Sequence, residues 1–343
     1  MKSKSSTINF FNNKSVLISG GTGSFGKNFA LKLLKYGKPK KIVIFSRDEL
    51  KQYEMAKQLP ENKYPIRYFI GDVRDRNRVY RACSGINIIV HAAAMKHVNA
   101  AEYNPTECIA TNINGAQNII DASIHNEVSH VIALSTDKAA NPINLYGASK
   151  LCSDKLFIAG NNLVGKKITR FSVVRYGNVA GSRGSVIPYF KELSLNNKNI
   201  FPITDEDATR FIIELDEGIS FVMKCFKNML GGEIFVPKLA SIKIIDLVKA
   251  FGPNYKYNII GLRPGEKKHE VMIPQEESRN SIDMGDHYLI QPSLAWWNTS
   301  DFIKKIKNQG KPASESFEYS SDTNTKWLSV TEIKKIISNT NNI

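Results

Sequence analysis

The chain has 343 residues, of which 42% are hydrophobic and 23% charged, so it can bury a substantial core and its composition excludes a disordered protein. The net charge is +15, but the lysines are dispersed and no basic run is interleaved with aromatic residues, which argues against nucleic-acid binding. The four cysteines form no CxxC pair, which argues against a disulfide framework and a zinc site. A polar opening over residues 1–13, without any apolar run long enough to cross a bilayer, predicts a cytoplasmic protein.

The first half of the chain alternates apolar runs with helical patterns. Continuous apolar runs occur at residues 14–19, 41–45, 66–70, 86–90 and 131–134, and amphipathic stretches lie at 25–36, 49–59 and 105–126. Apolar runs without polar alternation are typical of strands that are covered on both faces. A further helix is expected from about Tyr146, followed by a sixth strand at 167–175. The pattern therefore predicts an α/β fold, with a Rossmann-type doubly wound parallel sheet.

The pattern changes after Gly177. Residues 181–210 are rich in Gly, Pro and Asn, and they precede a short strand at 233–236, a helix at 242–251 and a strand near 257–260. We expect a Rossmann domain over residues 1–180. Residues 181–343 are expected to form mainly a smaller C-terminal substrate-binding domain, with some segments returning to the Rossmann sheet. The polar stretch 308–324 predicts a mobile surface segment, and 329–337 predicts a helix opened by Ser329 or Thr331.

A glycine-rich loop, GGTGSFG, follows the first expected strand directly. Gly20, Gly23 and Gly26 would allow a tight turn, the close approach of a pyrophosphate and close packing of the next helix. The start of that helix offers free N–H groups and a favourable dipole to phosphates. Because the motif lies between an expected strand and an expected helix, it predicts a site for a dinucleotide cofactor.

The end of the second expected strand distinguishes the two nicotinamide cofactors. NAD-binding chains place an acidic residue on the ribose about 20 residues after the glycine loop, whereas Ser46 and Arg47 come first here. A guanidinium can bind a 2′-phosphate through two N–H groups, so we expect NADP. The alternative is a surface arginine paired with Asp48 or Glu49. The expected cofactor contacts are Gly20, Thr22, Gly23, Ser24, Phe25, Gly26, Ser46, Arg47, Asp48, Glu49, Leu50, Lys51, Asp72, Val73, Ala92, Ala93, Tyr146, Lys150 and Val179.

Tyr146 and Lys150 form a YxxxK pair whose spacing places both residues on one helix face. A phenol has a pKa near 10. A nearby ammonium and the charge of the nicotinamide would lower the pKa of Tyr146 and make it a base for a substrate hydroxyl. The pair follows the segment STDK at the end of the fifth expected strand, and parallel sheets carry their active sites at the carboxyl ends of their strands.

Seven segments together resemble one enzyme family: GGTGSFG, SRDELK, GDVRD, HAAAMKHV, LSTDKAANPINLYGASK, RYGNVAGSRGSV and RPGEKKHEVM. They are similar to the inverting UDP-N-acetylglucosamine 4,6-dehydratases, extended short-chain dehydrogenases/reductases that begin pseudaminic acid synthesis. The resemblance runs from about Lys14 to the segment FEYSSDTNTKWLSV. It implies a UDP-N-acetylglucosamine substrate, tightly held NADP, a homo-oligomer such as a hexamer, and a role in flagellin glycosylation.

The resemblance implies oxidation at carbon 4, loss of water across carbons 5 and 6, hydride return to carbon 6 and inversion at carbon 5. The product would be UDP-2-acetamido-2,6-dideoxy-β-L-arabino-hex-4-ulose. Tyr146 and Lys150 would serve the oxidation, Lys138 would be the base at carbon 5, and Asp137 the acid for the 6-hydroxyl. Lys138 and Tyr146 both stay open as the residue that reprotonates carbon 5. A lysine base must lose its proton near neutral pH, which requires burial or cationic neighbours.

The same resemblance implies substrate contacts with the sugar, the nucleotide and the diphosphate. Arginines suit the diphosphate because their geometry matches paired oxygens. The histidines 91, 97 and 269 lack metal-ligand spacing, so we expect structural histidines and no metal. The implied substrate contacts are Lys96, Asn178, Arg183, Gly184, Ser185, Val186, Ile187, Thr204, Arg210, Arg263 and Glu266.

Three other functions compete with this hypothesis. A retaining 4,6-dehydratase would share the scaffold, but such relatives often carry a membrane anchor. A 4-epimerase would need no acid–base pair beyond Tyr146 and Lys150, so Asp137 and Lys138 argue against it. An NADP-binding regulator without activity predicts damaged catalytic residues, whereas all four are present.

Overall fold

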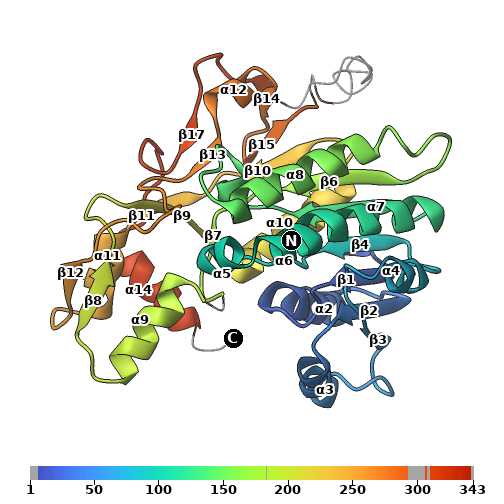
Figure 1. Cartoon of the computed structure of the whole chain (residues 1–343), viewed down its shortest axis with the longest axis horizontal. Coiled ribbons are helices and arrows are strands. Elements are labelled where there is room, and N and C mark those ends of the chain that lie inside the picture. The colour runs from blue at the N-terminus through green and yellow to red at the C-terminus, as the bar shows by residue number, and fades with distance from the viewer. Residues whose placement is uncertain (1–6, 183, 293–305, 307–309, 341–343) are drawn as a thin grey trace.

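The computed structural model in Figure 1 describes residues 7–182, 184–292, 306 and 310–340. A 10-stranded sheet forms its centre, in the order β16-β14-β15-β10-β6-β5-β4-β1-β2-β3. The strands from β10 to β3 run parallel, and their order confirms the doubly wound Rossmann-type class. These parallel strands are β1 (Ser15–Ser19), β2 (Lys41–Ser46), β3 (Ile66–Ile70), β4 (Ile88–His91), β5 (His130–Leu134), β6 (Arg170–Val174) and β10 (Ile234–Pro237).

Segments from the second half of the chain extend this sheet. The short strand expected at 233–236 is β10, which pairs in parallel with β6. Beyond it the sheet turns antiparallel, because β15 (His287–Ile290), β14 (Ser281–Asp283) and β16 (Lys311–Pro312) follow as an edge. The large sheet thus contains residues from both ends of the chain.

Helices cover both faces of the sheet, as the continuous apolar runs predict (Figure 1). Val16 and Ile18 of β1 pack in the cluster that contains Phe29, whereas Leu17 packs in the cluster that contains Ile119. One face carries α2 (Ser24–Tyr36) and α10 (Leu215–Asn228), and the other carries α4 (Arg76–Ala82), α7 (Gly115–His125) and α8 (Leu145–Gly160). Both faces of the central strands are therefore covered by helices and shielded from solvent.

The helix expected over 105–126 is divided. It consists of α6 (Pro105–Ile109), one π-helical turn (Ala110–Asn114) and α7. Within this turn the Asn112 side chain accepts from the Met95 backbone N–H at 2.8 Å and donates to the Ser149 hydroxyl at 2.9 Å. The π-helical turn therefore ties the loop after β4 to helix α8. Other helices of the sheet layer are α3 (Glu49–Gln58) and α5 (Val98–Tyr103).

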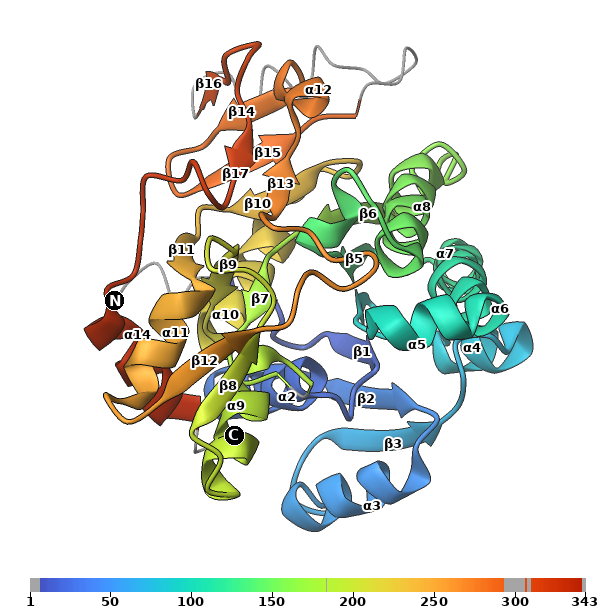
Figure 2. The ribbon, with the colours of Figure 1, turned by 60° about the vertical axis from the view of Figure 1, so that its left-hand side comes forward.

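A smaller lobe lies beside the carboxyl ends of the parallel strands (Figures 1 and 2). Its core contains Phe190 and Phe201, whose rings stack with centroids 4.5 Å apart. Ser329 caps the last helix in a capping box with Glu332, which confirms one of the two expected starts. The lobe comprises α9 (Val186–Leu195), β8 (Ile200–Ile203), α11 (Ile244–Phe251), β12 (Lys256–Ile259) and α14 (Val330–Asn339).

A three-stranded sheet joins the lobe to the Rossmann part. Its strands are β7 (Asn178–Val179), β9 (Thr209–Ile213) and β11 (Ala240–Lys243). The expectation of a mobile surface segment at 308–324 is wrong for its two strands, because β16 pairs with β14 and β17 (Tyr319–Ser320) pairs with β13 (Val271–Ile273). The polar composition of the stretch gave no indication that Tyr319 is buried. Its side chain is 5% exposed and packs against Phe211.

Candidate active site

The glycine-rich loop connects β1 to α2 and leaves the start of α2 open. Helix α2 begins after Gly23 with neither a side-chain cap nor an acidic residue in its first turn, so its first N–H groups are available to an anion. Gly20 has φ +65°, and a Cβ there would lie 2.9 Å from the Ala93 nitrogen. A Cβ on Gly26 would lie 2.6 Å from the Gly21 Cα. The loop therefore fits the pyrophosphate of a nicotinamide dinucleotide.

The carboxyl end of β2 lies beside this loop. The Thr22 hydroxyl donates to the Ser46 hydroxyl at 3.1 Å. Asp48 caps α3 by accepting from the Lys51 backbone N–H at 3.0 Å, and its carboxylate also pairs with the Lys51 ammonium. The Arg47 side chain is 67% exposed and lies 3.8 Å from Asp72, so its ion-pair partner is neither Asp48 nor Glu49. Arg47 thus has the freedom to meet a phosphate.

The loop after β3 is organised around Asp72. Arg74 donates to its carboxylate at 2.6 Å and 2.9 Å. Burial alone would raise the pKa of Asp72, but these bonds from Arg74 hold it below its ordinary value. Val73 is 5% exposed and its side chain packs against Gly115. The side chains of Asp72 and Val73 thus already have protein partners, while Glu49 and Leu50 on α3 are exposed.

Helix α8 carries Tyr146 and Lys150 at its start. Asn144 caps the helix by accepting from the Gly147 N–H at 2.7 Å, and its amide donates to the Gly265 carbonyl at 2.8 Å. Burial raises the pKa of Tyr146 to about 12, although Lys138 and a hydrogen bond with Thr136 act to lower it. The cation that lowers the pKa of this phenol is therefore Lys138.

Lys150 is 3% exposed. Burial lowers the pKa of Lys150, and the negative charge of Asp154 opposes the change. Asp154 accepts from Ser135 at 2.6 Å and lies 3.9 Å from the fully buried Arg175, which pairs with Glu277 at 2.6 Å. This buried network was missed in the sequence. The position of Asp154, four residues after Lys150, was the available signal.

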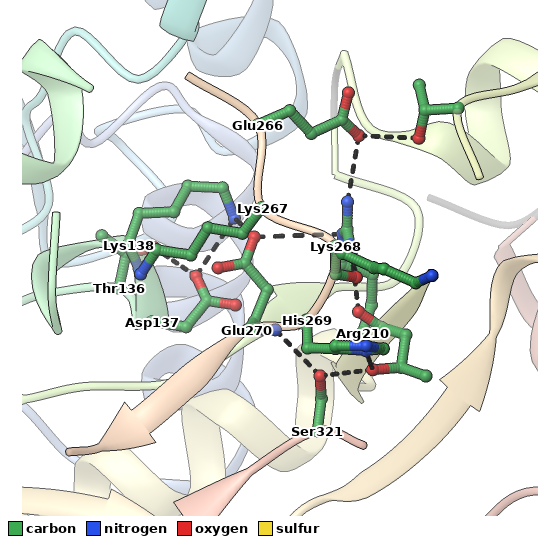
Figure 3. Close-up of polar contacts among 12 residues, drawn as sticks. Thr136, Asp137, Lys138, Arg210, Glu266, Lys267, Lys268, His269, Glu270 and Ser321 are labelled. Atoms are coloured by element: carbon green, nitrogen blue, oxygen red, sulfur yellow. Dashed lines mark hydrogen bonds and ion pairs between the residues drawn. The ribbon is translucent and has the colours of Figure 1, made fainter. Parts of the chain in front are cut away.

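Lys138 lies between two carboxylates at the end of β5. Its Nζ is 3.2 Å from Asp137 Oδ1 and 3.0 Å from Glu270 Oε1, and the Thr136 hydroxyl donates to Asp137 at 2.8 Å (Figure 3). Burial acts to lower the pKa of Lys138, but the charges of Asp137 and Glu270 raise it above its ordinary value. Burial alone therefore does not meet the requirement stated for a lysine base, because two buried anions outweigh the desolvation in this state.

Glu270, which comes just before β13, was not assigned from the sequence. It is 2% exposed. Its backbone N–H donates to the Ser321 hydroxyl at 2.9 Å, and its carbonyl accepts from the Ser321 N–H at 2.8 Å. In the sequence, only its place in the segment RPGEKKHEVM could have pointed to this residue, because its hydrogen-bond partner Ser321 is about 50 residues away.

Three of the expected substrate residues converge on the carboxylate of a fourth, Glu266. Glu266 accepts from Thr204 at 3.2 Å and from Arg210 at 3.0 Å, and Arg263 lies 4.0 Å away. Arg210 is 8% exposed and also donates to the carbonyls of Thr209 and Lys268. The Arg263 side chain is 54% exposed. Of these two arginines, Arg263 is therefore the more accessible to a diphosphate.

Asn178 and Ser185 line a small cavity with Val179, Val186, Ile187 and Arg210. The Asn178 Oδ1 and the Ser185 Oγ are buried without a hydrogen-bond partner. Such groups are costly when nothing satisfies them, so a water molecule or one polar ligand atom is expected beside them. Gly184 has φ +75°, and a Cβ there would lie 2.3 Å from the His97 ring. Lys96 is exposed in the loop after β4, and Arg183 lies outside the described residues.

No group of three or more His, Cys, Asp or Glu residues in the described part of the chain is placed to hold a metal ion. His91 is buried with its Nδ1 2.8 Å from the Ser19 hydroxyl, and His269 lies 2.9 Å from the Thr209 hydroxyl. Both histidines thus have structural partners. Within the described ranges, no helix is long and apolar enough to span a membrane.

Comparison with known proteins identifies the family. The family model described as polysaccharide biosynthesis protein matches residues 16–292. Two Campylobacter jejuni proteins, both named UDP-N-acetylglucosamine 4,6-dehydratase (inverting), are 53% identical over 332 residues, which cover 96% of this chain and 99% of each relative. A Rickettsia akari protein named UDP-glucose 4-epimerase is 38% identical over 334 residues, covering 95% of this chain and 96% of the relative.

Among solved structures, Pen from Bacillus thuringiensis superimposes with a TM-score of 0.87 at 35% identity, covering 97% of this chain and 99% of that one. These matches confirm the extended short-chain dehydrogenase/reductase fold and the resemblance to the inverting dehydratases. The chain therefore belongs to the polysaccharide biosynthesis protein family.

Proposed function

We propose that this protein is a UDP-N-acetylglucosamine 4,6-dehydratase that inverts carbon 5, a hydro-lyase. The observation that carries the proposal is the Asp137–Lys138 pair beside Tyr146 at the carboxyl end of β5. A hydroxyl–ketone interconversion at carbon 4 needs only a tyrosine base. Removal of the carbon 5 proton and the 6-hydroxyl needs a second acid and a second base. The 53% identity to proteins named as inverting dehydratases supports the same conclusion.

The first step is oxidation of the sugar at carbon 4. When bound, the nicotinamide cofactor takes up a hydride from carbon 4 and returns it to carbon 6. Tyr146 acts as a phenolate and takes the proton of the 4-hydroxyl. The Lys138 ammonium lowers the pKa of Tyr146 and so favours that phenolate, against the burial that raises the pKa. The charge of Asp154 favours the ammonium form of Lys150, which is buried on the same helix as Tyr146.

The second step is the loss of water, which the 4-ketone makes possible by acidifying the carbon 5 proton. In the resting site Lys138 is an ammonium beside the Asp137 carboxylate. Transfer of one proton from Nζ to Oδ1 creates the amine base and the carboxylic acid that the sequence predicts. Lys138 then takes the carbon 5 proton while Asp137 protonates the departing 6-hydroxyl. This exchange returns the pair to its resting charges.

The third step is protonation of carbon 5 after hydride return. Lys138 removes the original proton from one face, so it is poorly placed to return a proton to the other. Tyr146 still carries the proton of the 4-hydroxyl, and giving it to carbon 5 regenerates the phenolate. The proton balance therefore favours Tyr146 as the residue that completes the inversion.

The finer assignments rest on the residues and on the family resemblance. We propose NADP rather than NAD because Arg47 is exposed at the end of β2. We also propose that residues 1–180 bind the cofactor and that 181–343 bind mainly the substrate, with Arg263 at the diphosphate. The resemblance to the inverting dehydratases further supports a cytoplasmic homo-oligomer that supplies pseudaminic acid synthesis and flagellin glycosylation.

A 4-epimerase is the second candidate function, because a relative with that name is 38% identical over most of the chain. The dehydratase and epimerase activities are distinguished by incubating the purified protein with UDP-N-acetylglucosamine in heavy water and recording proton NMR spectra. The dehydratase gives a 4-keto-6-deoxy sugar of L-arabino geometry with deuterium at carbon 5. A first product of D-xylo geometry would contradict inversion, and UDP-N-acetylgalactosamine would identify an epimerase.

A further inference from the structure

Glu270 is a buried carboxylate with no role in the steps above. Its Oε1 lies 3.0 Å from the Lys138 Nζ, and its Oε2 is buried without a hydrogen-bond partner. Asp137 has the same arrangement, because its Oδ1 contacts Lys138 and its Oδ2 has no partner. Asp137 and Glu270 thus each contact the Lys138 ammonium through one carboxylate oxygen, while the other oxygen has no hydrogen-bond partner (Figure 3). An unpaired carboxylate oxygen is costly in a dry site, so its retention requires an explanation.

The charges around Glu270 come from every neighbouring element. Lys138 and Asp137 belong to the 3₁₀ turn (Asp137–Ala139) after β5, and Tyr146 on α8 is coupled to both of them. Arg210 of β9 places its Nε 3.9 Å from the Glu270 Oε1. Lys267 is coupled to Glu270, Asp137 and Lys138 through space, while its Nζ donates to the Ala140 carbonyl at 2.6 Å. Lys138 is the only one of the three cations within hydrogen-bond distance of the Glu270 carboxylate among the described contacts.

The backbone of Glu270 is held in place independently of Lys138. Two hydrogen bonds with Ser321 join the residue to the segment that follows β17 directly. The Ser321 hydroxyl is itself 2.7 Å from that of Thr209, at the start of β9. Glu270 is therefore anchored to the sheet region beside Arg210, whereas Lys138 comes from the Rossmann part.

We propose that Glu270 is a positioning residue for the elimination, which holds the Lys138 amine at carbon 5 and stabilises the ammonium that forms there. The inference rests on the proposed function. In that step the C5–H bond breaks and an N–H bond forms on Lys138. The electron pair forms the double bond between carbons 5 and 6, and the C6–O bond breaks as Asp137 protonates the departing oxygen. Glu270 neither gains nor loses a proton, so its contribution is its charge and its geometry.

Glu270→Gln tests this inference, because glutamine keeps the shape and an acceptor oxygen but removes the charge. Losing an opposite charge at this distance lowers the pKa of a partner by about one to three units. We expect the elimination to slow roughly 10- to 100-fold while oxidation at carbon 4 continues. Reduced cofactor should then accumulate, which stopped-flow absorbance at 340 nm detects. The limb of the pH–rate profile that belongs to Lys138 should move to lower pH.

Three variants serve as matched controls. Glu276→Gln removes an exposed carboxylate on α12 (Gln275–Ser278), and its kinetics should equal those of the unaltered protein. Glu266→Gln removes a partner of Arg210 from the same loop, and it should raise KM rather than trap reduced cofactor. Glu270→Asp keeps the charge on a shorter side chain, so it should recover part of the lost rate and remain interpretable if the glutamine variant does not fold.

Two results would overturn the inference. One is an unchanged elimination rate in Glu270→Gln. The other is an equal loss of cofactor reduction and elimination in both Glu270 variants, which is what a purely structural residue would give. The unaltered protein separates this inference from the proposed function. If it forms no 4-keto-6-deoxy sugar, the dehydratase assignment fails. If it turns over normally and Glu270→Gln leaves the elimination rate unchanged, only the positioning role of Glu270 is contradicted.

Discussion

Arg47→Ala should remove the preference for NADP, so that the variant binds NADP and NAD with similar affinity. The Arg47 side chain follows β2, is 67% exposed and has a distant ion-pair partner in Asp72 at 3.8 Å. Hydrogen bonds to charged groups contribute about 1.5–3 kcal/mol. Solvent screening at an exposed guanidinium favours the lower end of that range. We therefore expect roughly tenfold weaker binding of NADP and unchanged binding of NAD.

Isothermal titration of cofactor-free protein with NADP and with NAD measures both affinities. The difference between the cofactors should shrink as the salt concentration rises, because the contact is electrostatic and near the surface. Arg76→Ala removes another exposed arginine, on α4, and it should leave both affinities unchanged. Equal binding of the two cofactors by the unaltered protein, or an equal loss of both in Arg47→Ala, would refute the reasoning.

Three further changes test other parts of the account. Tyr146→Phe removes the base for the 4-hydroxyl, so turnover should fall about 10²- to 10⁴-fold without any accumulation of reduced cofactor; normal cofactor reduction would contradict this role. Gly26→Ala places a Cβ 2.6 Å from the Gly21 Cα, so the purified variant should lose bound cofactor, which the absorbance of the released nucleotide measures. Burial raises the pKa of Glu233 from 4.5 to about 7, so the folded state binds its proton more tightly and this stabilisation is lost as the pH rises through that range. Relative to Glu233→Gln, the free energy of unfolding in urea should therefore fall by about 3 kcal/mol between pH 4.5 and pH 8, and parallel curves would be the contrary result.

The sheet could be predicted because its signals are local. The apolar residues Val16, Leu17 and Ile18 at the centre of β1 are buried, and the loop after it contains glycines, such as Gly20 and Gly26, at which a Cβ would clash. The end of the chain could not be predicted in the same way. Tyr319 is buried by pairing with β13, about 50 residues away, and a polar local composition carries no trace of that partner.

The same distinction applies to the site. Asp137, Lys138, Tyr146 and Lys150 lie within 14 residues of sequence, and the structure places them at the carboxyl end of β5 and the start of α8. Glu270 is more than 130 residues away from Lys138, and only the tertiary fold brings its carboxylate to 3.0 Å. The protonation state of Lys138 therefore could not be deduced from the sequence, because it depends on this distant charge.

The most direct measurement for the central claim follows a deuterium label from carbon 4 of the substrate. The protein is incubated with UDP-N-acetylglucosamine deuterated at carbon 4, and the product is analysed by mass spectrometry and NMR. A dehydratase that borrows and returns the hydride delivers the deuterium to carbon 6 of a 4-keto-6-deoxy sugar. Deuterium that returns to carbon 4 of an intact hexose would contradict the account.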